Sequence, residues 1–152
     1  MLLENKIAVV TGAGRGIGRG IALALAREGA MVVVNYNGSK DRAEEVVRTI
    51  EEAGGKATAV QCNISDFETA KEFFANVVKE YGKIDILVNN AGITKDNLMM
   101  KMSEEEFQSV IQTNLAGTFH GVKFVTRPMM KQRQGRIINI ASVSGVIGNM
   151  GQ

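Results

Sequence analysis

Residues 7–26 read IAVVTGAGRGIGRGIALALA, and this stretch decides the fold. Its first four residues form a short apolar run, which is typical of a strand buried on both faces of a parallel sheet. Small residues follow at Gly12, Gly14, Gly16 and Gly18, and apolar residues then recur at helical spacing. A strand that passes through a glycine-rich turn into a helix predicts a phosphate site, because the helix N-terminus presents free N–H groups to an anion. A glycine-rich turn without a ligand is the alternative.

Outward from this unit, apolar runs continue to alternate with helical patterns. Further strands are predicted at 31–34, 57–61, 84–88 and 136–140, and helices at 43–50, 67–81, from 103 onward and at 115–133. Ser103 and Glu106 can form a capping box at the fourth helix, and Pro128 predicts a kink or break in the fifth. The alternation indicates an α/β fold, a Rossmann-like doubly wound parallel sheet of order 3-2-1-4-5 with helices on both faces. Its ligand site is expected at the carboxyl ends of the strands.

Composition and charge narrow the classes of protein. The 152 residues are 45% hydrophobic and 22% charged, which fits a single globular domain over residues 1–152. The net charge of +2 has no long basic run, so nucleic-acid binding is not expected. No apolar run reaches membrane-spanning length, and a lone cysteine, Cys62, fits a reducing, cytoplasmic compartment as a small buried side chain. The only histidine, His120, has no partners for a metal site or a catalytic triad, and is expected to be structural or solvated.

The phosphate loop and one later motif resemble a known family. Thr11 followed by glycines in the spacing G-x-x-x-G-I-G is similar to the signature of the short-chain dehydrogenase/reductase family. Asn89-Asn90-Ala91-Gly92 after the fourth strand matches the N-N-A-G motif of that family, and it argues against a methyltransferase that binds S-adenosylmethionine. The resemblance implies a nicotinamide dinucleotide site. It places the following residues there: Gly12, Gly14, Arg15, Gly16, Ile17, Gly18, Asn90, Ala91 and Gly92.

The second and third strands indicate which dinucleotide is bound. A carboxylate at the end of the second strand usually bonds the ribose 2′-OH of NAD, and residues 34–40 contain none. Arg15 can hold a 2′-phosphate through its planar fork, and Ser39 and Lys40 could add donors, so NADP(H) is expected. Asp41 is an alternative ribose ligand, although it belongs to the next helix. The resemblance further implies that Asn63 and Ile64 lie against the adenine ring.

Two residues are implied to take part in catalysis. In the family, an asparagine at the position of Asn114 stabilises a kink at the start of a helix and orders a water of the proton relay. The family's catalytic serine, which hydrogen-bonds the substrate carbonyl oxygen, corresponds to Ser142 after the fifth strand. Ser144 is the less favoured choice, and a merely structural serine is the alternative reading.

The resemblance covers the whole chain. Residues 90–102, 129–140 and 145–152 are most similar to the bacterial 3-oxoacyl-[acyl-carrier-protein] reductases. It implies NADPH-dependent reduction of the 3-keto group of an acyl thioester in fatty acid biosynthesis, by a homotetramer. Arg133 and Arg136 could dock the acidic carrier protein, or could belong to a solvated helix end. Met99, Met100 and Met102 could border the acyl-chain entry or pack locally. Reduction of acetoacetyl-CoA or another carbonyl, and dinucleotide binding without catalysis, remain open.

The family's tyrosine and lysine pair, spaced Y-x-x-x-K, is absent from residues 1–152. In the family this pair follows the serine by roughly a dozen residues, and the tyrosine donates the proton to the carbonyl oxygen. We therefore expect an incomplete domain that ends after the fifth strand. Alone it should lack appreciable ketoreductase activity and should tend to associate.

Overall fold

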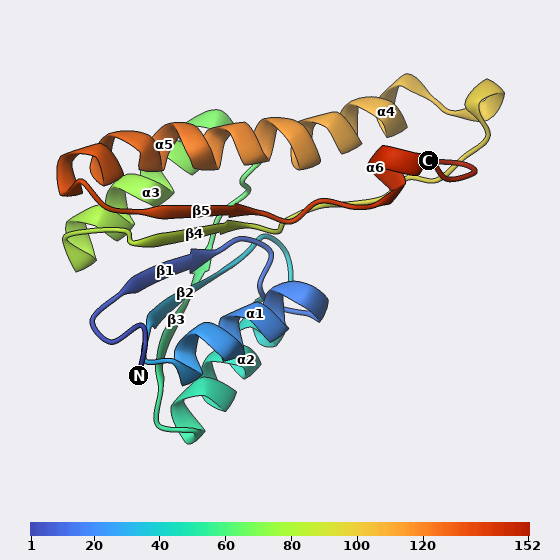
Figure 1. The fold of residues 1–152 in the computed structure, drawn as a ribbon. Helices are drawn as coiled ribbons and strands as arrows, with labels where there is room; N and C mark the ends of the chain where they lie inside the picture. The colour runs from blue at the N-terminus through green and yellow to red at the C-terminus, as the bar shows by residue number, and fades with distance from the viewer.

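A computed structural model describes all residues from 1 to 152 and contains one five-stranded parallel sheet (Figure 1). The strands are β1 (Ile7–Val10), β2 (Met31–Tyr36), β3 (Lys56–Gln61), β4 (Ile86–Asn89) and β5 (Arg136–Asn139). Their order across the sheet is β3-β2-β1-β4-β5, and every neighbouring pair is parallel. The α/β class and the strand order predicted from the sequence are confirmed.

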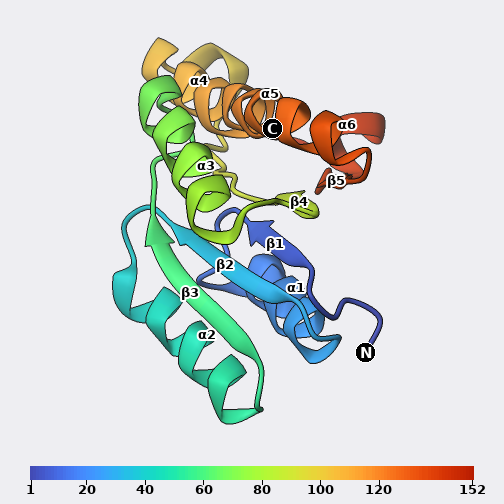
Figure 2. The ribbon, with the colours of Figure 1, turned by 90° about the vertical axis from the view of Figure 1, so that its left-hand side faces the viewer.

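Helices cover both faces of the sheet (Figures 1 and 2). They are α1 (Gly16–Arg27), α2 (Lys40–Glu52), α3 (Phe67–Tyr81), the 3-10 turn η1 (Met99–Lys101), α4 (Glu104–Val110), the π-helical η2 (Ile111–Ala116), α5 (Gly117–Gln132) and the short α6 (Ser144–Ile147). In both views α1 and α2 lie on one face and α3 and α5 on the other. None of these helices combines the length and apolar character needed to cross a membrane.

Alternation along the strands divides the core into two layers. Val9 and Val33 point into the layer under α3 and α5, which also contains Phe74. Val10 and Val34 point the other way, into the layer under α1 and α2. Successive side chains of a strand face opposite sides, so continuous apolar runs fill both layers at once. The register aligns the strand ends, with Val10 opposite Val34 and Val88.

Helix ends follow the expected local chemistry in several places. Ser103 and Glu106 form both bonds of a capping box at α4. Gly82 ends α3 at φ 78°, a left-handed conformation that glycine adopts without steric cost. Asp66 caps the other end of α3 by accepting a hydrogen bond from Thr69 N.

Three expectations about element boundaries are wrong. The fourth and fifth helices were expected to be separate, but α4, η2 and α5 form one unbroken helical run over residues 104–132. Pro128 lies inside α5 without a break, because the helix continues past it to Gln132; the alternative expectation of a kink stays a prediction. Strand β4 begins at Ile86 rather than residue 84, because the Asp85 carboxylate accepts the Ile7 N–H at 2.9 Å in place of a strand carbonyl.

Candidate functional site

The loops after β1 and β4 are joined by hydrogen bonds at the carboxyl edge of the sheet. Thr11 Oγ1 accepts the backbone N–H groups of Asn90 and Ala91, each at 3.0 Å. In return, Asn90 Nδ2 donates to the carbonyl oxygens of Thr11 and Gly12 at 3.0 and 3.1 Å. The Asn90 side chain thus bridges the two neighbouring strand ends, and its amide nitrogen is directed at protein backbone.

Two glycines of the phosphate loop are required by this close approach. Gly12 has φ 62°, and a β-carbon there would lie 2.9 Å from Ala91 Cα. A β-carbon on Gly18 would collide with Asn90 Nδ2 and would lie 2.6 Å from Gly12 O. Larger residues would therefore force the two loops apart.

The first turn of α1 provides donors for an anion. The N–H groups of Gly16, Ile17 and Gly18 have no intrahelical partner, and the N-cap residue, Arg15, forms no side-chain cap. No acidic residue occupies this first turn. These free donors and the helix dipole favour a negatively charged ligand at this end of α1.

A buried asparagine at the end of β2, Asn35, ties three strand ends together. Asn35 is 2% exposed, its Oδ1 accepts Gly12 N at 3.2 Å, and its Nδ2 donates to Cys62 O at 3.1 Å. Its backbone carbonyl accepts Ala13 N at 2.9 Å. Sequence reasoning noted only that Asn35 is not a carboxylate, and missed that it fixes the phosphate loop.

The residues expected to select the dinucleotide surround the start of α2. Arg15 and Ser39 are exposed, and Lys40 pairs with Glu44 at 3.4 Å within α2. Asp41 lies in the first turn of α2, as expected. A β-carbon on Gly14 would lie 3.6 Å from Arg42 Cβ, so the first turn of α2 borders the phosphate loop. Arg42, which the sequence did not single out, thus adds a positive charge beside the phosphate loop.

In the loop after β3, the side chain of Ile64 is buried, and its backbone N–H is left without a partner in the chain. Asn63 Oδ1 accepts from Ser65 N and Ser65 Oγ at 3.1 and 2.7 Å. Ile64 is 5% exposed and packs in the core layer under α5, while its N–H forms no hydrogen bond within the chain. Cys62 is 1% exposed, and burial, with Asp66 nearby, raises the pKa of its thiol to about 11. The prediction that Cys62 is a small core residue is confirmed.

Asn114 holds the segment that follows the N-N-A-G motif. Its Oδ1 accepts Ile93 N at 2.8 Å and its Nδ2 donates to Ile93 O at 2.9 Å. The expectation that Asn114 begins a helix is wrong, because it lies within the π-helical η2. The wider π-helical turn shifts the side chain relative to an α-helix, and such turns are frequent at functional sites.

Ser142 lies beyond the end of β5, beside the β4 loop. Ile140 N donates to Asn89 O at 2.9 Å, and Asn89 Nδ2 donates to Asn139 Oδ1 at the same distance, so the two strand ends are paired. Ser142 is exposed, and its Oγ accepts the Ser144 N–H at 3.2 Å. The hydroxyl proton of Ser142 is left free to donate to a ligand.

Comparisons with known proteins bear on this arrangement. The family model for short chain dehydrogenases matches residues 6–152. The chain belongs to this family. The structure superposes on that of a short-chain dehydrogenase from Mycobacterium avium with a TM-score of 0.92 and 40% identity, over 99% of this chain and 58% of the other.

Curated relatives of this short-chain dehydrogenase chain carry a more specific name. It is 54% identical over 148 residues to the 3-oxoacyl-[acyl-carrier-protein] reductase FabG of Staphylococcus epidermidis. It is 48% identical over 150 residues to the 3-oxoacyl-[acyl-carrier-protein] reductase of a Synechocystis species. These matches cover 97% and 99% of this chain and 61% of each relative, so the chain spans about three fifths of their length.

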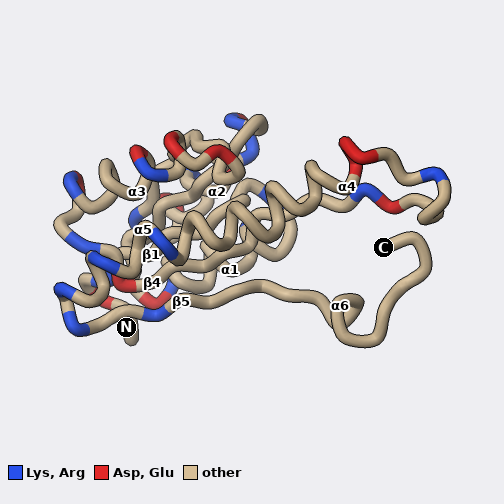
Figure 3. The backbone as a smooth tube through the Cα atoms, turned by 90° about the horizontal axis from the view of Figure 1, so that it is seen from above, with Lys and Arg blue, Asp and Glu red and all other residues tan.

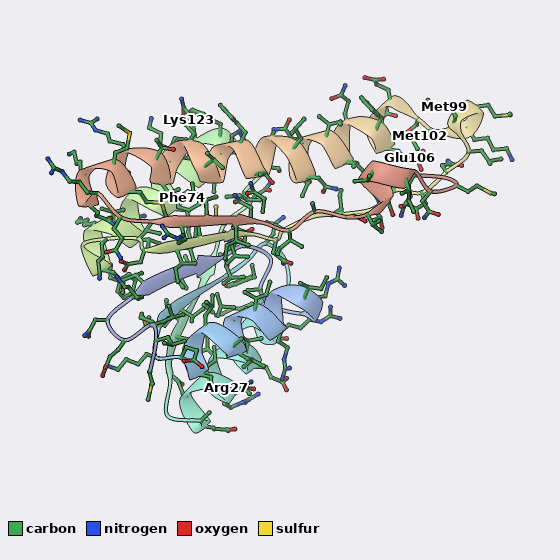
Figure 4. The ribbon with its side chains drawn as sticks, viewed as in Figure 1. Arg27, Phe74, Met99, Met102, Glu106 and Lys123 are labelled. Carbon is green, nitrogen blue, oxygen red and sulfur yellow. The ribbon has the colours of Figure 1, made fainter.

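No three His, Cys, Asp or Glu side chains are grouped to hold a metal ion. His120 is 5% exposed, and its Nδ1 lies 2.8 Å from Ile64 O, which makes it a structural contact. Met99 and Met100, which could border a substrate entry or pack locally, lie in η1 and are each 89% exposed. Figure 4 shows Met99 beyond the start of α4.

Proposed function

We propose that this chain forms the NADP(H)-binding part of a reductase that acts on the 3-keto group of an acyl thioester, as the names of its relatives indicate. The observation that carries the proposal is the site at the carboxyl edge, where the phosphate loop, the N-N-A-G loop and Ser142 lie on adjacent strands. The strand order places β1, β4 and β5 side by side. A ligand lying along this edge reaches all three loops.

The site fits an extended dinucleotide. Three free N–H groups at the start of α1 suit a pyrophosphate, and Gly12 and Gly18 let the phosphate loop pack directly against the N-N-A-G loop. Arg15, with Arg42 and Ser39 nearby, supports a 2′-phosphate and hence NADP(H) over NAD(H). Asn63 and the free N–H of Ile64 offer polar contacts to an adenine ring at the end of β3. When bound, NADPH supplies the hydride.

Ser142 and Asn114 are the chain's own contributions to the reacting end. We assign the Ser142 hydroxyl, whose oxygen accepts the Ser144 N–H, as a donor to the substrate carbonyl oxygen. A donor aimed at this oxygen stabilises the negative charge that develops there in the transition state. Asn114 positions Ile93 and Gly92 through its paired contacts with the Ile93 backbone.

Recognition of an acyl carrier protein is assigned to the end of the molecule where α5 finishes. Arg133, at φ 54°, and Arg136 are both exposed there, and Figure 3 shows several Lys and Arg residues gathered at this end. None of these arginines forms an ion pair within the chain. A cluster of unpaired cations complements an acidic partner and speeds encounter.

Association of four copies is proposed on separate grounds. The helical run 104–132 carries exposed large apolar side chains, which are Phe107, Leu115, Phe119 and Met130. Exposed apolar surface of this kind marks an interface between chains.

Because residues 1–152 contain no Y-x-x-x-K pair, the decisive experiment measures NADPH consumption with 3-oxoacyl thioesters by a full-length parent protein that adds this pair to the chain. Oxidation of NADPH with a 3-oxoacyl group on acyl carrier protein, faster than with the same group on CoA, supports the proposal. Equal rates would assign a general acyl-thioester reductase, and dinucleotide binding without turnover of either would refute the reductase.

A further inference from the structure

One helical run holds the loop that follows β3. Gln112 Nε2 donates to Ser65 O at 2.7 Å, and His120 Nδ1 lies 2.8 Å from Ile64 O. Between them, a β-carbon on Gly117 would lie 3.0 Å from Ile64 Cγ2, so η2 and α5 lie directly on the loop. Three residues spaced along the helix thus contact two consecutive residues of the loop.

The His120 contact has a defined direction. A carbonyl oxygen only accepts hydrogen bonds, so Nδ1 carries the proton and donates to Ile64 O. The His120 ring is 5% exposed and packs edge-on against Phe67, with ring centroids 5.4 Å apart. A buried carbonyl that loses its only donor is costly, so this bond favours one loop conformation.

Beyond β3, the loop is held by hydrogen bonds within itself and by the helical run. β3 is an edge strand of the sheet, and the last bonds to β2 are made by Cys62, whose N–H donates to Tyr36 O and whose carbonyl accepts Asn35 Nδ2. After Cys62, the carbonyls of Ile64 and Ser65 are both taken by the helical run. The position of the free Ile64 N–H therefore depends on that helix, while Asn63 is also held within the loop, where its Oδ1 accepts from Ser65 and its carbonyl accepts the Asp66 N–H.

We propose that His120 and Gln112 are positioning residues for the adenine end of the dinucleotide, and this rests on the proposed NADP(H) site. They act on the ligand only through the loop at residues 63–65. Asn114, on the same helical run, holds Ile93 on the nicotinamide side. One helical run thereby sets both ends of the ligand site.

The test compares a matched pair of substitutions in the purified protein. His120→Leu removes the donor and keeps an apolar side chain, whereas His120→Asn places an N–H donor near the position of Nδ1. Adenosine 2′,5′-bisphosphate and NADPH are titrated by calorimetry, and amide hydrogen exchange is followed at residues 63–66. Lys123→Gln is the control, because Lys123 lies on the outer side of α5 (Figure 4).

His120→Leu should weaken both ligands about tenfold and speed exchange at residues 63–66, because fewer molecules hold the loop in its binding conformation. His120→Asn and Lys123→Gln should stay within about twofold of the parent protein. Gln112→Leu should weaken the affinity for both ligands about threefold. Because Gln112 is exposed, this variant provides the test if His120→Leu does not fold.

Unchanged affinity in His120→Leu and Gln112→Leu, with the parent binding normally, would overturn the inference alone. An equal loss in His120→Asn and His120→Leu would assign the effect to packing and would also overturn it. Failure of the parent protein to bind either ligand would instead refute the proposed function.

Discussion

At the scale of single residues, Arg15 determines the expected choice of dinucleotide. Its side chain is exposed in the phosphate loop and forms no ion pair. The end of β2 carries no carboxylate that would bond the ribose 2′-OH of NAD. We predict tighter binding of NADPH than of NADH, and a loss of about tenfold in NADPH affinity in Arg15→Leu, from one missing charged hydrogen bond. Fluorescence titration with both dinucleotides measures this. NADH affinity should be unchanged in the variant, and a parent protein that binds NADH more tightly would contradict the assignment.

Ser142 carries the second prediction at this scale. In the full-length parent protein, Ser142→Ala should lower kcat on the order of a hundredfold while leaving NADPH affinity unchanged, because the hydroxyl acts on charge that develops during the reaction. Steady-state rates and calorimetric titration separate the two effects. Ser144→Ala is the matched control, and near-normal turnover in Ser142→Ala would remove the serine from its assigned role.

The sequence reveals some of these residues and conceals others. Gly12, Gly18 and Asn90 stand in recognisable spacings, and the contacts that require them follow directly after predicted strands. Asn35 is not recognisable in this way, because its partners are separated from it by more than twenty residues and meet it only in the folded sheet. His120 was expected to be structural or solvated, and the sequence could not distinguish the two, because its partner Ile64 lies 56 residues away and leaves no local signal.

At the scale of elements, the seat of α5 on β4 depends on a helical glycine. A β-carbon on Gly121 would collide with Asn89 Oδ1 and lie 3.2 Å from Leu87 Cδ2. We predict that Gly121→Ala destabilises the fold by about 1–3 kcal/mol, since a packed layer cannot accept another carbon. Gly20→Ala is the control in α1, where nothing lies within 4 Å of the new carbon.

The control substitution should stabilise the fold by about 0.4–1 kcal/mol, because alanine lowers the entropy of the unfolded chain. Urea denaturation of both variants gives the two values. If Gly121→Ala did not lower the free energy of unfolding, or lowered it no more than Gly20→Ala, then α5 would not pack against β4 through Gly121.

Asp85 links the start of β4 to β1 and to two lysines. Burial opposes ionisation of Asp85, but the hydrogen bond from Ile7 N and the neighbouring Lys83 and Lys6 outweigh it, and its pKa lies below the ordinary value of 3.8. We predict that Asp85→Asn costs roughly 1.5–3 kcal/mol at neutral pH. A lowered pKa gives stability that is present above the ordinary value and is lost as pH falls through the folded-state pKa.

The difference in unfolding free energy between the parent and Asp85→Asn should therefore be constant near neutral pH and shrink below pH 3.8. Chemical denaturation at a series of pH values follows it. A difference that persists unchanged in acid would mean that the Asp85 charge contributes nothing.

Element type and order were predictable, whereas some boundaries were not. Continuous apolar runs and glycine stops mark β1 to β5 and the ends of α1 to α3, because strand and helix periods differ. The joining of α4 and α5 through η2 leaves no comparable mark, since a π-helical turn has no residue signature and depends on tertiary contacts such as Asn114 with Ile93.

At the scale of the whole molecule, β5 is an exposed edge of the sheet. Every residue of β5 is exposed, with Ile137 and Ile138 at 37% and 45%, and β3 is the only other edge. Unpaired strand edges and exposed apolar side chains recruit other chains. We predict that a protein consisting of residues 1–152 self-associates at micromolar concentration.

Light scattering after size-exclusion chromatography measures this association. Ile138→Lys should reduce it, because a charged side chain on an edge strand opposes pairing. A substitution of the same kind on an exposed helix, Thr126→Lys, is the control. A monodisperse monomer in the parent chain would contradict the prediction.

The division of the core into two layers that share no residue has a consequence for how such a sequence can diverge. Phe74 belongs to the layer under α3 and α5, and Ile50 to the layer under α1 and α2, with the sheet between them. Substitutions without shared neighbours combine additively. Mutations in one core layer can therefore accumulate without compensating mutations in the other, so the two layers can diverge in sequence independently.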